Sequence, residues 1–232
     1  MAQLESDKWQ SSLRLFHMIG YGLLLFVLLD IIDIFFPPHF MDPIWEFQML
    51  GAVVERAPLP LLALVLVFYG ETNLRARWEK NVLKLLSRFS LLVGLLFLLL
   101  ILLGIGDTIR IYNINNKQIN EQLVQQQSKI QQFEDKLLKA KDNELEDIIK
   151  RVKTENGSLE IKDAQQLRFS LLTEANKSER NLKNQAEATR KTKNNALIKS
   201  SVKWNLGCLI AGDLFIRVWQ ATRWARGPSK QK

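Results

Sequence analysis

The chain has 232 residues, a formal net charge of +8 and a hydrophobic content of 47%, and its apolar residues are concentrated in a few long runs. Its single cysteine excludes an intramolecular disulfide and a CxxC metal or redox site. The sequence contains no Gly-rich phosphate loop and no HExxH or GxSxG element, which are typical of common enzyme classes. We therefore expect a membrane protein that is not an enzyme and that carries no cofactor.

The first expected membrane span covers residues 14–36 and follows a short cytoplasmic segment, residues 1–13. A helix of this length reaches roughly 34 Å, and the hydrocarbon core of a bilayer is about 30 Å thick. The apolar run ends at Pro37 without a small-residue cleavage site, which favours a retained span over a signal peptide. Asp30 and Asp33 share one face of this helix near its end.

Residues 37–57 are expected to form an outer loop with a short helix at the membrane interface. Asp42 is suited to cap that helix and Pro43 to occupy its first position, because a proline there lacks only an N–H that would stay unpaired. Glu55 and Arg56 are adjacent and form either a surface pair or a docking feature. We favour the surface pair.

The second expected span, residues 58–78, begins with Pro58 and Pro60 and has a short apolar run. Residues 58–70 reach only about 20 Å, so a re-entrant piece is the alternative to a span. The segment spans if its helix continues past Gly70 and places the next arginines, Arg75 and Arg77, at the interface. The third span, residues 83–106, contains the strongest membrane signal in the chain.

Residues 107–202 are polar and predict an antiparallel coiled-coil hairpin between the third and fourth spans, with its tip near residues 155–159. Spacings of four and three residues mark the seam of the outgoing arm, with one polar layer: Ile119, Leu123, Gln126, Ile130, Phe133 and Leu137. The returning arm carries its own apolar series: Leu167, Leu171, Ala175, Leu182, Ala186 and Ala196-Leu197. Because the seam has gaps, we expect a homo-oligomer or other membrane proteins to pack against the hairpin. The two glycosylation sequons, at Asn156 and Asn176, are interpreted as a turn and a solvated face.

The fourth expected span, residues 203–224, carries Asp213 at its centre and Arg217 one turn later. An isolated carboxylate at the centre of a span costs about 2.5–3.5 kcal/mol on insertion scales, and pairing at i, i+4 lowers that cost. Trp204 and Trp224 bracket roughly 30 Å of helix, the separation of two interfacial aromatic belts. We favour a structural pair, and a proton or ion path that also uses Asp30 and Asp33 is the alternative.

The Lys and Arg distribution places both termini in the cytoplasm and the hairpin in the periplasm or lumen. Residues 225–232 form a basic tail that, with the end of the last span, is expected to contact anionic headgroups through Arg223, Arg226, Lys230 and Lys232. The expected interfacial anchors are the tryptophans Trp45, Trp78, Trp204, Trp219 and Trp224. His17 and His39 have no companions at metal-ligand spacing, and Cys208 is interpreted as a packing residue. Mixed charges in the polar region argue against nucleic-acid binding.

Two passages, DIIDIFFPPHFMDPIWEFQMLGAVVERAPLPLLALVLVFYG and VKWNLGCLIAGDLFIRVWQATRWARG, resemble the HpsJ-like family of cyanobacterial membrane proteins, which is named for a hormogonium polysaccharide locus. The resemblance implies a plasma- or thylakoid-membrane protein that is an accessory in polysaccharide production or secretion. It transfers no catalytic residue to this chain.

The predicted fold is an all-α membrane protein with about four spans and an inserted coiled-coil hairpin. The leading functional hypothesis is a scaffold or accessory protein that supports exopolysaccharide biosynthesis or secretion. The second is a membrane-organising or assembly factor of photosynthetic membrane complexes, and the third is a proton- or ion-conducting transporter subunit. The co-purifying partners distinguish the first two, and the effect of Asp213→Asn on a measured flux tests the third.

Overall fold

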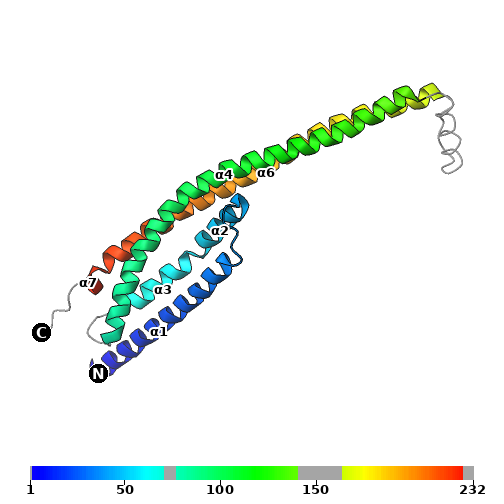
Figure 1. The fold of residues 1–232 in the computed structure, drawn as a ribbon. Coiled ribbons are helices and arrows are strands. Elements are labelled where there is room, and N and C mark those ends of the chain that lie inside the picture. The colour runs from blue at the N-terminus through cyan, green and yellow to red at the C-terminus, as the bar shows by residue number, and fades with distance from the viewer. Residues whose placement is uncertain (1, 71–76, 141–163, 227–232) are drawn as a thin grey trace. The chain divides into compact units, whose positions relative to one another are not determined.

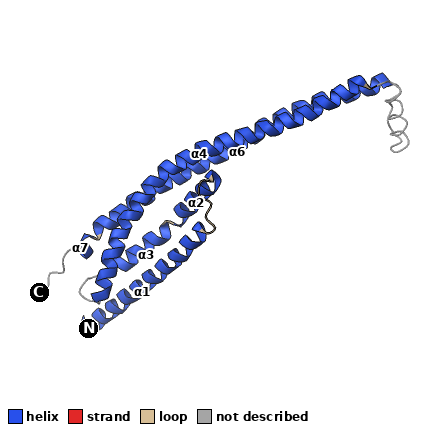
Figure 2. Cartoon of the chain, viewed as in Figure 1, coloured by secondary structure: helices blue, strands red, loops and turns tan. Residues whose placement is uncertain are grey.

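The computed structural model describes residues 2–70, 77–140 and 164–226, and its regular elements are all helices (Figures 1 and 2). They are α1 (Ala2–Phe35), α2 (Pro43–Arg56), α3 (Pro58–Phe68), α4 (Arg77–Lys139), α6 (Ala164–Ala221) and α7 (Arg223–Arg226). No strand occurs within these described ranges. The all-α prediction is therefore confirmed.

The chain divides into two compact units that share the two longest helices. The first unit consists of Met1–Ile111 and Leu197–Lys232, and we call its described part the helical bundle. The second unit consists of Tyr112–Ala196, and we call its described part the paired arms. Helices α4 and α6 each contribute one portion to the bundle and another to the arms.

Three helical segments in the described part are long and apolar enough to cross a membrane: Ser12–Phe35, Pro43–Phe68 and Trp78–Lys139. The first matches the expected span 14–36 closely, although α1 already begins at Ala2, so the expected leading segment is helical too. The expected fourth span, residues 203–224, which runs from α6 into the start of α7, is not among the three. Charged and polar side chains lower its mean hydropathy, and a fourth span stays a prediction.

The second span differs from the expected range 58–78. Helix α3 ends at Phe68, Tyr69 is extended, and Gly70 has a φ of +93°, a conformation that glycine adopts without strain. The apolar segment instead starts earlier, because Ala57 between α2 and α3 keeps a right-handed helical conformation. Pro58 then occupies the first position of α3 and does not break the path. The expected interfacial residue Arg75 lies outside the described residues.

Helix α2 contributes to the core of the bundle, and the interfacial position expected for it stays a prediction. Leu50 of α2 is fully buried and belongs to a cluster contributed by four helices and the residue between α2 and α3: Leu50, Ala57, Leu64, Phe97, Cys208, Ala211 and Phe215. Phe97 and Phe215 stack there with ring centroids 5.6 Å apart. An N-cap starts α2 as predicted, since the Asp42 carboxylate accepts a hydrogen bond of 3.0 Å from the Ile44 N–H.

Helices α4 and α6 approach each other closely at two glycines of the bundle. A Cβ added at Gly94 would lie 3.1 Å from the Gly212 carbonyl oxygen, and one added at Gly212 would lie 3.2 Å from the Gly94 oxygen. Close backbone contact through small residues is a common way for membrane helices to pack. The face of α6 that carries Gly212 is therefore the inner face of that helix.

The paired arms run antiparallel, because contacts pair early residues of one arm with late residues of the other. Asn116 accepts a hydrogen bond from Asn194 at 3.3 Å, and Gln127 donates one to Glu179 at 3.2 Å. Leu137 packs against Ala164 and Leu167. The tip expected near residues 155–159, with Asn156, lies outside the described residues, so the closed hairpin stays a prediction.

The seam of the arms matches the predicted one only in part. Ile119 and Leu137 are buried as expected, but Phe133 is 46% exposed. The predicted polar layer at Gln126 is wrong by one residue, since Gln126 is exposed and the half-buried Gln127 faces α6. A straight α-helix drifts by about 20° per heptad from a strict repeat of seven residues, which moves side chains off a predicted seam along its length.

Candidate functional site

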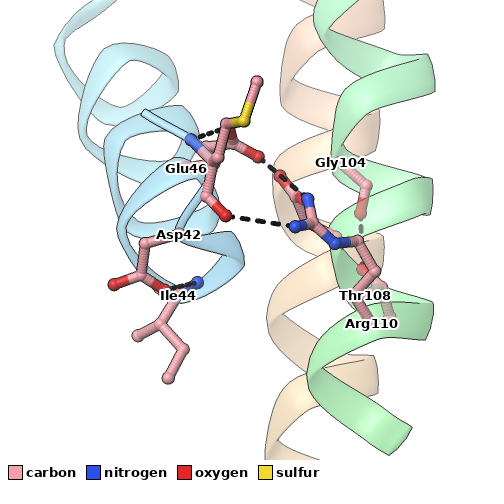
Figure 3. A network of polar contacts seen from close by, with 8 residues as sticks. Asp42, Ile44, Glu46, Gly104, Thr108 and Arg110 are labelled. Atoms are coloured by element: carbon pink, nitrogen blue, oxygen red, sulfur yellow. Dashed lines mark hydrogen bonds and ion pairs between the residues drawn. The ribbon is translucent and has the colours of Figure 1, made fainter. Parts of the chain in front are cut away.

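A network of polar contacts joins α2 to α4 in the bundle (Figure 3). Arg110 of α4 points toward α2, and its Nη1 lies 3.4 Å from Glu46 Oε2. Its Nη2 donates a hydrogen bond of 3.1 Å to the Met41 carbonyl oxygen. Met41 has a φ of 73°, which is rare for a residue with a side chain, and its N–H donates to Glu46 Oε1. Two partners therefore hold the strained residue that precedes α2.

A second, buried carboxylate, that of Asp107, also contacts Arg110. The Asp107 side chain is only 1% exposed, and its Oδ1 lies 3.3 Å from Arg110 Nη1, the nitrogen that also meets Glu46. One guanidinium thus serves two carboxylates, while Asp107 Oδ2 is buried without a hydrogen-bond partner. Our sequence interpretation missed Asp107 and Arg110. The available signal was an ion pair at i, i+3 directly after the longest apolar run.

The adjacent residues Glu55 and Arg56 do not pair with each other as favoured above. Arg56 lies between the two carboxylates of the first span, 4.0 Å from Asp30 and 3.4 Å from Asp33. Glu55 instead pairs with Lys203 of α6 at 2.6 Å. Consecutive residues of a helix point in directions about 100° apart, so each reaches a different neighbouring helix.

The ion pair predicted within α6 is formed. Arg217 Nε donates to Asp213 Oδ2 at 2.6 Å, and both side chains are exposed on the surface of the bundle, 57% for Asp213 and 70% for Arg217. Among the described residues, no hydrogen bond or ion pair joins this pair to Asp30 or Asp33, which are held by Arg56. The structure therefore does not bring together the groups of the hypothetical proton path.

Hydroxyl groups supply polar contacts between α4 and residues at or just beyond the end of α6. Ser87 and Thr222 share a buried hydrogen bond of 2.7 Å, and Ser90 donates one of 2.8 Å to the Phe215 carbonyl oxygen. Side-chain hydroxyls are common partners between helices in apolar surroundings. These contacts fix the axial register of α6 against α4.

Four of the five predicted anchor tryptophans pack against other side chains. Trp45 meets Phe40 edge to face, and Trp204 packs against Phe47 at a centroid distance of 4.5 Å. Trp224 meets Phe68, and the guanidinium of Arg226 lies 4.2 Å from the Trp219 ring centroid. The fifth, Trp78, is 63% exposed. The exposed position of Trp78 at the start of α4 is compatible with an interfacial anchor. Trp204, by contrast, also packs against other side chains of the bundle.

Of the predicted basic tail, Arg223 and Arg226 form the short helix α7, while Lys230 and Lys232 lie outside the described residues. Arg226 folds back and donates a hydrogen bond of 2.9 Å to the Trp219 carbonyl oxygen. Its guanidinium is thus partly committed to the bundle.

The remaining candidate ligands have local structural partners. His17 Nε2 lies 2.7 Å from the Tyr69 carbonyl oxygen, and His39 Nδ1 lies 3.0 Å from the Pro37 carbonyl oxygen. Cys208 is a buried free cysteine in the core. No group of three His, Cys, Asp or Glu side chains with metal-binding geometry occurs in the part of the chain that the structure describes. Asn176 donates to the Leu172 carbonyl oxygen within its own helix.

Comparison with known proteins identifies a family for the chain. A family model described as HpsJ-like protein matches residues 11–223, which is most of the chain and includes the bundle and both arms. The chain belongs to the HpsJ-like family. No curated protein and no solved structure matches it. The family resemblance expected from the two passages in α1–α3 and α6 is thereby confirmed.

Proposed function

We propose that this HpsJ-like protein is a non-enzymatic membrane scaffold that spans the bilayer four times and supports exopolysaccharide biosynthesis or secretion. The observation that carries the proposal is the division of α4 and α6 between two surroundings. In the bundle these helices expose mostly apolar side chains, and in the arms they expose mostly charged and amide side chains. Such a chain is suited to hold a polar helical pair at a membrane.

The fourth span is part of the proposal and has specific support. Cys208, Ala211 and Phe215 on the inner face of α6 pack in the core that the three apolar segments share. The opposite face exposes large apolar side chains, including Leu206 and Leu209. A helix apolar on both faces, packed among spans, is expected to lie in the membrane with them.

A cysteine-accessibility experiment tests whether α4 crosses the membrane and on which side the arms lie. In a Cys208→Ala background, Gln131→Cys marks the arms and Lys80→Cys marks the start of α4. We expect a membrane-impermeant maleimide to label Gln131→Cys in intact cells and Lys80→Cys only after lysis. Labelling of both positions from the same side would contradict the proposed topology.

Purification from the native membrane tests whether the protein supports exopolysaccharide biosynthesis or secretion. The tagged protein is isolated in mild detergent, and co-purifying proteins are identified by mass spectrometry. We expect glycan synthesis or export proteins with the full chain, and their loss when residues 112–196 are replaced by a short Gly/Ser linker. Photosynthetic complexes in their place would contradict the polysaccharide role and support the assembly-factor hypothesis.

A further inference from the structure

The outward face of α6 in the bundle combines an apolar stripe with one ion pair. Val202, Leu206, Leu209 and Asp213 follow one another at spacings of four, three and four residues, and all are exposed. This spacing is that of a helix–helix seam. The buried residues Cys208, Ala211 and Phe215 occupy the other face, so the stripe is not used for packing within the bundle.

The ion pair leaves hydrogen-bonding capacity on this surface. Arg217 bonds to Asp213 through Nε, and in the described part of the chain neither side chain reaches another helix by a hydrogen bond or ion pair. The terminal nitrogens of a guanidinium are strong donors, and donors that face hydrocarbon are costly. If residues 203–224 span the membrane, as proposed above, a protein surface is the favourable covering for this pair.

We propose that a second copy of the chain covers this face, with α6 packed against α6. This inference rests on the proposed fourth span. The reason for a second copy is charge complementarity, since the stripe offers one carboxylate and one guanidinium a single turn apart. Two copies in one membrane have the same orientation, so a two-fold axis along the membrane normal brings the two pairs to the same level.

In this arrangement, Arg217 of each copy bonds its own Asp213 through Nε and the Asp213 of the second copy through a terminal nitrogen. Charges of opposite sign then alternate around a closed group of four side chains. Leu206 and Leu209 of both copies exclude lipid and water on one side of this group. A polar position within an apolar seam also selects one register, because shifted registers leave the charges unpaired.

Charge reversal in trans tests the inference. Full-length Asp213→Arg carries two cations on the stripe, and full-length Arg217→Asp carries two carboxylates. We expect each variant alone to lose dimers about tenfold or more in detergent, because like charges meet across the seam. Co-expressed with different tags, the two variants should form a mixed dimer at a yield close to that of the wild-type protein.

A role of the pair within one helix alone predicts no such rescue, so a failure of the mixed dimer to form would overturn the inference. A monomeric wild-type protein, or single variants that remain dimeric, would overturn it equally. The matched controls are the single reversals Lys117→Glu and Glu121→Lys, at an exposed i, i+4 pair of the arms. Each should leave the dimer fraction unchanged.

Two cysteine variants separate this inference from the proposed topology. In a Cys208→Ala background, Leu209→Cys on the stripe should form a disulfide-linked dimer on mild oxidation, while Leu99→Cys, an exposed position of α4, should not. Leu214→Cys then reports the surroundings of α6. Rapid labelling of Leu214→Cys by a water-soluble maleimide would contradict the fourth span itself, whereas protection without cross-linking at Leu209→Cys would overturn the dimer alone.

Discussion

At the scale of single residues, the cations Arg56 and Arg110 determine how carboxylates are accommodated in the bundle. Arg56 faces Asp30 and Asp33, and Arg110 faces two more carboxylates from different helices. Each of these four carboxylates thus has an opposite charge nearby, which lowers the cost of ionised groups there. Three of the pairs connect different helices, the Asp107–Arg110 pair lies within α4, and the groups do not form a continuous series of titratable side chains in the described part of the chain.

Gly51 of α2 leaves room for the Trp204 ring to pack closely against the helix. A Cβ at this position would lie 2.5 Å from the Trp204 ring, which itself packs against Phe47. We expect Gly51→Ala to lower the free energy of unfolding by about 1–3 kcal/mol, because the ring must move. Gly106→Ala is the control, since an added Cβ meets nothing within 4 Å there. Thermal unfolding in detergent measures both, and equal melting temperatures would contradict the packing argument.

Glu179 provides a pH-dependent contribution in the paired arms. The hydrogen bond and charge of Lys183, 2.8 Å away, and a hydrogen bond from Gln127 hold the pKa of the Glu179 carboxyl below its usual value. A carboxylate with a lowered pKa stabilises the folded arms above the pKa of the unfolded chain, about 4.3, and that contribution disappears as the pH falls through the folded value. We expect Lys183→Ala to raise the pKa of Glu179, as measured by carboxyl-carbon NMR titration. An unchanged titration would contradict the assignment of Lys183 as the main cause.

At the scale of elements, α2 connects all the long helices of the bundle. It contacts α1 through Arg56, α4 through Glu46 and α6 through Glu55, and it places Leu50 in the core. Its mostly apolar sequence is compatible with an interfacial helix as well as with a buried one. Contacts with three other helices make α2 a central packing element of the bundle.

The buried position of Leu50 predicts a large effect of truncation. We expect Leu50→Ala to lower the free energy of unfolding by about 2–5 kcal/mol, because it removes buried methyl groups and leaves a cavity. Leu62→Ala in α3 is the matched control, since Leu62 is exposed on the bundle surface. Chemical unfolding in detergent compares the two variants. Equal losses would show that α2 is not packed as described.

At the scale of the whole molecule, the two units have separate cores. The core clusters of the bundle contain only residues of Met1–Ile111 and Leu197–Lys232, whereas Leu137, Ala164 and Leu167 form a cluster within the arms. Ile111 is the last bundle residue before the arms, and Leu197 is the first bundle residue after them. Both belong to one small cluster of buried residues. The bundle residues at which the arms begin and end are therefore close together.

Removal of the arms should leave the bundle folded. We expect a chain in which a short Gly/Ser linker replaces residues 112–196 to insert into membranes and to elute as a single species from size exclusion in detergent. Its far-UV circular dichroism should retain a helical spectrum with a cooperative thermal transition. Aggregation of this chain, in a detergent that keeps the full-length protein soluble, would contradict the independence of the two units.

The sequence by itself determined the all-α class, the first and third apolar segments and the i, i+4 pair Asp213–Arg217, because each depends on composition or on spacing along one helix. It also determined the family, through two passages that flank the polar region. Only the tertiary structure decided that Glu55 and Arg56 have different partners, that Gln127 and not Gln126 faces the opposite arm, and that Asp107 is buried beside Arg110. The physical reason is that a helical sequence specifies which residues share a face, whereas the neighbour that covers each face depends on how the helices pack.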